Sequence, residues 1–105
     1  MAVYNVLALG AVAAVKSRGL LDTIKIVGND GIGDALAAVK SGEMYATNAE
    51  SPFALGQEVA KIGHAVASGE KVEESRVLQG KLITGAGVEE FCSYLRGIGD
   101  TATCK

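Results

Sequence analysis

Two acidic residues follow short strand-like runs of this chain, at positions where a carboxylate can meet a ligand. Asp30 comes just after the run 24–27, and Glu50 comes just after the run 44–47. Such runs predict short strands, and ligands of open α/β sheets bind beyond the carboxyl ends of the strands. Ionised carboxylates are strong, directional hydrogen-bond acceptors. The two acids therefore indicate a site for a polar ligand rich in hydroxyl groups, such as a sugar or a polyol.

Other interpretations of these positions remain open from the residues alone. Both acids precede a predicted helix, where a carboxylate complements the positive end of the helix dipole. Asn48 lies two residues before Glu50 and serves either a ligand or a turn. The glycine-rich stretch 28–33 lacks the Lys-Ser/Thr pair of a phosphate-binding loop, and Asp30 within it would repel a phosphate. We therefore do not expect a phosphate site there.

Few other residues could bind a metal or react. His64 is the only histidine and shares the polar side of a predicted helix with Glu58 and Lys61, so we expect a solvated surface residue. Cys92 falls on the apolar side of the last helix, where cysteine often packs as a small hydrophobic residue. Cys104, next to the terminus, has little reason to be buried. The even cysteine count predicts a disulfide between them in an oxidising compartment, and no metal or cofactor is expected.

The composition limits the possible classes of function. A chain of 105 residues forms one small domain at most, and an apolar share of 49% supports a folded core. The net charge of −2 argues against nucleic acid or an anionic membrane surface as the main partner. No apolar run reaches the roughly 18 residues that cross a bilayer, so direct membrane insertion is not expected. The apolar start lacks the features of a signal peptide, so Met1 is expected to be an internal or engineered start within a longer protein.

Apolar spacing and turn residues predict alternating helices and strands. Helices are expected over 5–18, 32–41, 52–68 and 88–95, and strands over 24–27, 44–47 and 77–84. Asn5 is expected to cap the first helix, and Ser51 followed by Pro52 the third. The helix over 5–18 is apolar on nearly every side, as in helices that are buried over most of their surface. These 105 residues hold little to bury it, so we expect its cover to come from a partner outside this chain. This order predicts an α/β fold with a mainly parallel sheet.

Four stretches resemble the type I periplasmic binding proteins, in particular the ribose/galactose-binding family of ABC importers. Residues 5–11 (NVLALGA) resemble the family's N-D-x-M-A-x-G-A helix start, and residues 26–31 (IVGNDG) resemble V-G-F-D-G. Residues 42–52 (GEMYATNAESP) resemble the crossover G-x-x-x-A-T-x-x-Q-x-P, and residues 68–72 (SGEKV) resemble a K-G-E-K-V turn. In this order they make residues 2–84 similar to the carboxyl-terminal part of such a protein.

The resemblance implies a partial Rossmann-like lobe of a protein whose two lobes close on a sugar or polyol about a hinge. Asp30 and Glu50 are then the first expected ligand contacts, although the family often has Gln at the second position. Tyr4 stands where a sugar-binding Asn is common, and Asn5 where an Asp is common; these two and Asn48 complete the expected site. The resemblance also implies a periplasmic or cell-surface location, a membrane permease of an ABC transporter as partner, and no enzymatic activity.

By the same resemblance, the chain 1–105 is a single fragment with three parts. Residues 1–50 would belong to the carboxyl-terminal lobe, 51–84 to a crossover helix and return strand, and 85–105 to a terminal helix and tail. Such a fragment would hold half a cleft. Its uncovered apolar surfaces predict that the isolated chain self-associates and binds its sugar weakly.

Two other functions fit parts of the pattern. The effector-binding domain of a LacI-type transcription regulator shares this fold, but the sequence contains no helix-turn-helix segment. A glycoside-acting enzyme would use Asp30 and Glu50 as a carboxylate pair, but no motif points to catalysis. The sugar-binding interpretation therefore remains the main prediction.

Overall fold

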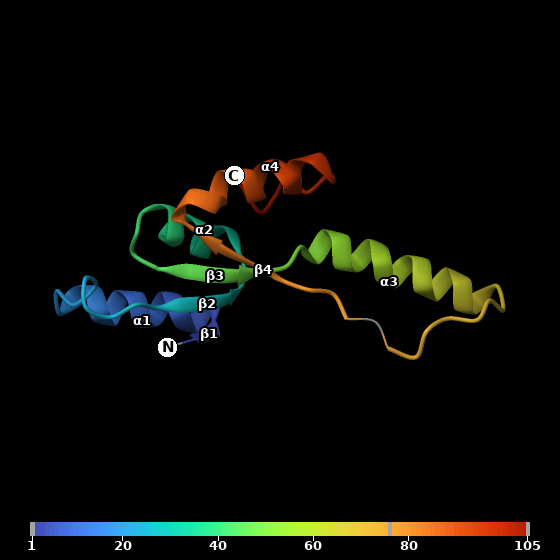
Figure 1. Cartoon of the computed structure of the whole chain (residues 1–105), viewed down its shortest axis with the longest axis horizontal. Coiled ribbons are helices and arrows are strands. Elements are labelled where there is room, and N and C mark those ends of the chain that lie inside the picture. Colours follow the sequence, from blue (N-terminus) through green and yellow to red (C-terminus); the bar gives the residue numbers. More distant parts are fainter. Residues whose placement is uncertain (1, 76, 105) are drawn as a thin grey trace.

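Strands and helices alternate along the chain, as Figure 1 shows. The computed structural model describes residues 2–75 and 77–104, so the expected start at Met1 lies outside the described residues. In chain order, the elements are β1 (Ala2–Tyr4), α1 (Asn5–Ser17), β2 (Val27–Asp30), α2 (Gly33–Lys40), β3 (Ala46–Ala49), α3 (Pro52–Ala67), β4 (Lys81–Thr84), the 3₁₀ turn η1 (Gly85–Gly87) and α4 (Val88–Gly97).

The described strands form one sheet in the order β1-β2-β3-β4. β1, β2 and β3 are parallel, and β4 is antiparallel to β3. The predicted α/β fold with a mainly parallel sheet is therefore correct. Because side chains alternate along a strand, the register places Gly28, Thr47 and Ile83 on one face and Asn29 and Asn48 on the other.

The strand ends differ from the sequence prediction in a way that bears on the site. β2 begins at Val27 rather than at residue 24, β3 begins at Ala46 rather than at residue 44, and β1 was not predicted. β4 covers only the second half of the predicted strand 77–84. The predicted strand bounds followed runs of apolar residues, whereas hydrogen-bonded pairing with neighbouring strands sets the observed strand ends. Asp30 is consequently the last residue of β2, and Asn48 lies inside β3.

Helices α1, α2 and α4 cover one face of the sheet. The crossovers from β1 to β2 and from β2 to β3 run in the same direction along the sheet, so right-handed connections place α1 and α2 on the same side. α1 contacts α2, and α2 contacts α4. The core beneath them includes the large side chains of Val12, Ile26, Leu36, Val39, Met44, Ile83, Phe91 and Leu95.

Helix α1 is buried on one side only, which agrees with the expectation that this chain alone holds little to bury a helix that is apolar nearly all round. Ala8 and Val12 are buried, whereas Val6 and Leu7 are 74% and 63% exposed. Asn5 is also not the N-cap, because β1 runs directly into the helix and Tyr4 takes that position without a side-chain hydrogen bond. The outer apolar side of α1 has no cover within the described residues.

Helix α3 projects away from the sheet, as Figure 1 shows, and none of its residues is buried. The molecule reaches 58 Å along its longest axis for this reason. The helix begins as predicted, with Pro52 in its first turn and Ser51 as N-cap. The Ser51 hydroxyl oxygen accepts a hydrogen bond from the Ala54 N–H over 3.1 Å. A local capping signal therefore defines the start of α3 even though little else in the chain packs against it.

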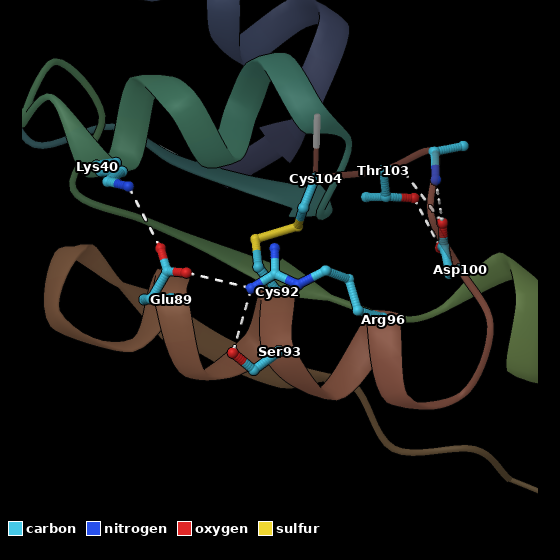
Figure 2. The surroundings of a disulfide bond; sticks show 9 residues. Lys40, Glu89, Cys92, Ser93, Arg96, Asp100, Thr103 and Cys104 are labelled. Carbon is cyan, nitrogen blue, oxygen red and sulfur yellow. Dashed lines mark hydrogen bonds and ion pairs between the residues drawn. A yellow bond between two sulfur atoms is a disulfide. The ribbon is translucent and has the colours of Figure 1, made fainter.

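The carboxyl-terminal end turns back along α4, as Figure 2 shows. Cys92 of α4 and Cys104 form a disulfide, which is the pairing expected from the sequence. An ion pair between Lys40 and Glu89, 3.4 Å apart, also joins α2 to α4. The end of the chain is thereby held against the helical side of the lobe.

Candidate ligand-binding site

Polar side chains gather where the three parallel strands end. Tyr4 of β1 pairs in register with Asn29 of β2, and Asn29 pairs with Asn48 of β3. Asp30 ends β2, and Glu50 follows β3 directly. The carboxyl ends of parallel strands meet at one edge of a sheet, which is the usual place for ligands in this class of fold. The structure thus brings four of the predicted site residues to the same edge.

Two hydrogen-bonded side-chain amides connect β3 to the Asp30 carboxylate. The Asn48 amide nitrogen Nδ2 donates a hydrogen bond to Asn29 Oδ1 over 2.9 Å. The Asn29 Nδ2 in turn donates to Asp30 Oδ1 over 2.8 Å. Within the described residues, no hydrogen bond reaches Asp30 Oδ2. One carboxylate oxygen of Asp30 is therefore held by the protein, and the other can accept a hydrogen bond from a ligand.

Asn29 is a site residue that the sequence prediction missed. It was assigned to the turn after a strand that ended at residue 27, and turns are rich in asparagine. In the structure it lies inside β2, between Asp30 and Asn48. A signal that could have found it is the pairing of two asparagines at the ends of neighbouring strands, but the register that joins them is not evident from local sequence.

The backbone at Asp30 is strained. Its φ is +107°, a value that glycine adopts easily and other residues rarely do. Gly31 follows with φ +70°, and a Cβ at Gly31 would collide with Ala49 at the end of β3. The loop therefore passes close to β3, which requires glycine at position 31. Strain of this kind costs about 1–3 kcal/mol and clusters at ligand-binding positions.

The Asn5 side chain is buried below the strand ends and is not exposed at the edge of the sheet. It is fully buried, and Asn5 Oδ1 accepts a hydrogen bond from the Thr47 hydroxyl over 3.0 Å. Gly28 leaves room for it, since a Cβ at Gly28 would fall on the Asn5 side-chain oxygen. Asn5 Nδ2 is buried without a hydrogen-bond partner among the described residues. Asn5 therefore supports the strand ends from within, while Tyr4, 66% exposed, faces solvent.

Glu50 is exposed at the same edge but lines a separate hollow. A cavity of about 430 Å³ lies between the start of α3, the segment before β4, and α4. Glu50 and Lys81 line it together with the apolar side chains of Leu55, Leu78 and Phe91. Asp30 and the two asparagines do not line this cavity. The structure thus places Glu50 near the strand ends without bringing it into hydrogen-bond contact with Asp30.

The rest of the described chain offers little alternative chemistry. His64 is exposed on α3, as predicted. Residues 2–75 and 77–104 contain no group of three histidine, cysteine or acidic side chains placed to hold a metal ion. In the same ranges, no helix is both long and apolar enough to cross a bilayer. The edge around Asp30 is therefore the strongest candidate for a functional site.

Comparison with known proteins decides the family. A family model described as a periplasmic binding protein domain matches residues 1–71. The chain belongs to the periplasmic binding protein family. The match includes β1, β2 and β3 and therefore the whole edge around Asp30. The resemblance found in the four sequence motifs is confirmed.

Relatives within this family are solute-binding proteins. The chain is 36% identical over 77 residues to the ribose import binding protein of Salmonella typhimurium, and 40% identical over 78 residues to that of Haemophilus influenzae. These matches cover 73% and 74% of this chain and 26% of each relative. The chain thus spans about a quarter of the length of the curated relatives it matches.

Part of a solved solute binding protein has the same fold as this chain. That protein is an ABC transporter solute binding protein from Bacillus halodurans with bound myo-inositol. The TM-score is 0.76 at 32% sequence identity, and the match covers 86% of this chain and 32% of that chain. The predicted partial lobe of a type I periplasmic binding protein is therefore confirmed. These three matched proteins are named as ribose import binding proteins and a solute binding protein, not as LacI-type regulators or glycoside-acting enzymes.

Proposed function

We propose that this chain contributes one side of a sugar- or polyol-binding cleft to the solute-binding component of an ABC importer. The observation that carries the proposal is the Asp30 carboxylate, held at one oxygen by Asn29 and open at the other, at the carboxyl ends of three parallel strands. A carboxylate fixed in this way accepts a hydrogen bond from a ligand hydroxyl with little further ordering. The ribose and myo-inositol named for its relatives are ligands of this class.

The other edge residues suit the same ligand class. Tyr4 offers an exposed ring and a phenolic hydroxyl, which can pack against a sugar and exchange hydrogen bonds with it. Asn48 and Glu50 add polar groups at the end of β3. We assign Asn5 a supporting role, because its buried side chain has no open path to a ligand. The Tyr4 and Glu50 side chains differ from the amides common in the family, so the preferred sugar can differ as well.

The family supports an inference about location and partners. We infer that the intact protein acts in the periplasm or at the cell surface and delivers its ligand to the membrane permease of the transporter. We also infer that residues 1–50 belong to one lobe and that α3 reaches into the opposite lobe. The apolar stripe of Leu55, Val59, Ile62 and Val66 on α3 is spaced for one helix face and is exposed except at the half-buried Ile62, which supports this division.

In the isolated chain, we propose that a second copy covers the same stripe. Val59 and Val66 are 60% and 55% exposed, and they continue the apolar surface that Leu55 begins. A contiguous exposed apolar surface of this kind is an association site. Exchange of α3 between two copies is a low-cost route to a dimer.

Titration of the isotope-labelled chain with D-ribose and with myo-inositol, followed by NMR, tests the binding proposal. Only half of the cleft is present, so we expect affinity in the millimolar range or weaker, about −4 kcal/mol. Shifts should concentrate on the amides of Asn29, Asp30, Asn48 and Glu50. The proposal fails if neither compound shifts these amides, or if the shifts lie instead around the cavity beside α4.

A further inference from the structure

The last residues of the chain form a strap that leaves α4 and returns to the start of α2. We define the strap as residues 99–104. Gly99, with φ +96°, turns the chain, and the Asp100 N–H then donates to the Leu95 carbonyl over 2.9 Å. The buried Asp100 carboxylate accepts hydrogen bonds from the N–H groups of Ala102 and Thr103 over 3.1 and 3.0 Å, and from the Thr103 hydroxyl over 2.8 Å. The strap is therefore an ordered turn.

The disulfide fixes the far end of this strap. Cys104 is bonded to Cys92 in the middle of α4, and Figure 2 shows the strap running from Asp100 through Thr103 to that bond. Cys92 is itself buried in the core. The strap is thus held at both ends by α4, through the Asp100 turn and through the disulfide.

Between these anchors the strap meets the first residue of α2. The Thr103 carbonyl oxygen lies 2.5 Å from the position that a Cβ would take on Gly33, so the two backbones touch there. Gly33 ends the loop that begins at Asp30. The other side of this loop passes close to β3, where Gly31 meets Ala49. The loop is therefore confined between the sheet on one side and the strap on the other.

The strap also touches the start of α3. A Cβ on Gly99 would lie 3.3 Å from Cζ of Phe53, which belongs to the first turn of that helix. One short segment thus contacts the first turns of α2 and α3, the helices that follow β2 and β3.

We propose that the disulfide-held strap is a positioning element, which keeps the Asp30 loop in the conformation that binds ligand. The strained backbone at Asp30 persists only when its surroundings hold it. The sheet supplies one wall, and the strap supplies the other. This inference deepens the proposed function, because it rests on Asp30 as a ligand contact, and it assigns a role to residues outside the edge itself.

Amide hydrogen exchange on the full chain tests the strap without any sugar. Three variants are compared with the oxidised wild type: Cys92→Ser with Cys104→Ser, Gly33→Ala, and the control Gly97→Ala. Gly33→Ala keeps the disulfide but forces a methyl group against the Thr103 carbonyl. Gly97 is also a helical glycine near the strap, but a Cβ there meets nothing within 4 Å.

We expect exchange of the Leu36 amide, which donates to the Ile32 carbonyl in the loop over 3.0 Å, to accelerate on the order of tenfold in the double cysteine variant and in Gly33→Ala, since local opening governs exchange. Amides in the middle of α1 should change by less than about twofold, and Gly97→Ala should leave the loop unchanged. Unchanged exchange of the Leu36 amide in Gly33→Ala, or equal acceleration of all amides, would overturn the proposal. Because no ligand is present, a failure of sugar binding leaves this result intact.

Discussion

Asn48 Nδ2 donates a hydrogen bond to Asn29 Oδ1 across two neighbouring parallel strands, over 2.9 Å. This bond leaves the Asn29 amide nitrogen turned toward Asp30, to which it donates over 2.8 Å. Asn29 therefore transmits the position of β3 to the carboxylate at the end of β2. A substitution at Asn48 should therefore alter the affinity for the ligand even if Asn48 does not contact the ligand.

Asn29→Ala should weaken sugar binding and leave the fold intact. The substitution removes both side-chain hydrogen bonds, so the Asp30 carboxylate loses its fixed orientation. One hydrogen bond of this kind contributes about 0.5–1.5 kcal/mol, which corresponds to about a two- to thirteenfold loss of affinity. NMR titration with D-ribose measures the loss. Equal affinities of the variant and the wild type would show that the Asn29 side-chain hydrogen bonds do not contribute to ligand binding.

Gly28→Ala should destabilise the chain because the new methyl group would fall on the Asn5 side-chain oxygen. Overpacking of a buried site costs about 1–3 kcal/mol. Gly10→Ala is the matched control, since Gly10 lies in α1 and a Cβ there meets nothing within 4 Å. It should stabilise the helix by about 0.5–1 kcal/mol. Urea unfolding of both variants checks the pair, and similar midpoints would contradict the packing that we describe around Asn5.

The Asp100 turn should make stability depend on pH in the acidic range. The Thr103 backbone N–H, and then its hydroxyl, lower the pKa of Asp100 below its ordinary value. The unfolded chain therefore takes up the proton first as the pH falls. The stabilisation is complete above about pH 4 and is lost as the pH falls through the lowered pKa of the folded state.

Asp100→Asn removes this titration. The difference in melting temperature between wild type and variant should therefore shrink from about pH 6 to about pH 3. The pKa of Glu89 and of Glu90 is also lowered, chiefly by Arg96 and by Lys81 respectively, but both groups are present in both proteins and cancel in the difference. Thermal unfolding over a pH series gives the values. A difference that grows as the pH falls would contradict the assigned hydrogen bonds.

Val59→Glu should weaken self-association of the isolated chain. The substitution places a charge in the middle of the exposed apolar stripe on α3, where a second copy is proposed to pack. We expect the dimer dissociation constant to rise by at least about tenfold, roughly 1.4 kcal/mol. Gln57→Glu, exposed on the same helix outside the stripe, is the control and should have little effect. Sedimentation equilibrium of the three proteins gives the dimer dissociation constant of each. A monomeric wild type would contradict the proposed dimer face.

Local sequence signals account for the elements that depend on neighbouring residues. Ser51 and Pro52 begin α3 where predicted, because a capping hydroxyl and a fixed proline φ act within one turn. Asp30 also lies at the predicted edge of the sheet. The cysteine pair follows from an even count. These features need no knowledge of how distant segments meet.

The features that the sequence did not predict depend on contacts between distant segments. Asn29 joins the site only because β2 and β3 pair in a register that aligns it with Asn48. Asn5 turns inward because β1 leads straight into α1 and Thr47 and Gly28 provide a partner and a space. Hydrophobic periodicity cannot report such relationships.

The most direct test of the sugar-binding account is the affinity of Asp30→Asn for D-ribose or myo-inositol, measured by NMR titration beside the wild type and Asp22→Asn. Asp22 is an exposed acid in the loop at the opposite end of β2, so its substitution controls for the loss of one charge. A hydrogen bond to a charged group contributes about 1.5–3 kcal/mol, so Asp30→Asn should weaken binding by at least about tenfold, while Asp22→Asn binds as the wild type does. Equal affinity of Asp30→Asn and the wild type would contradict the account.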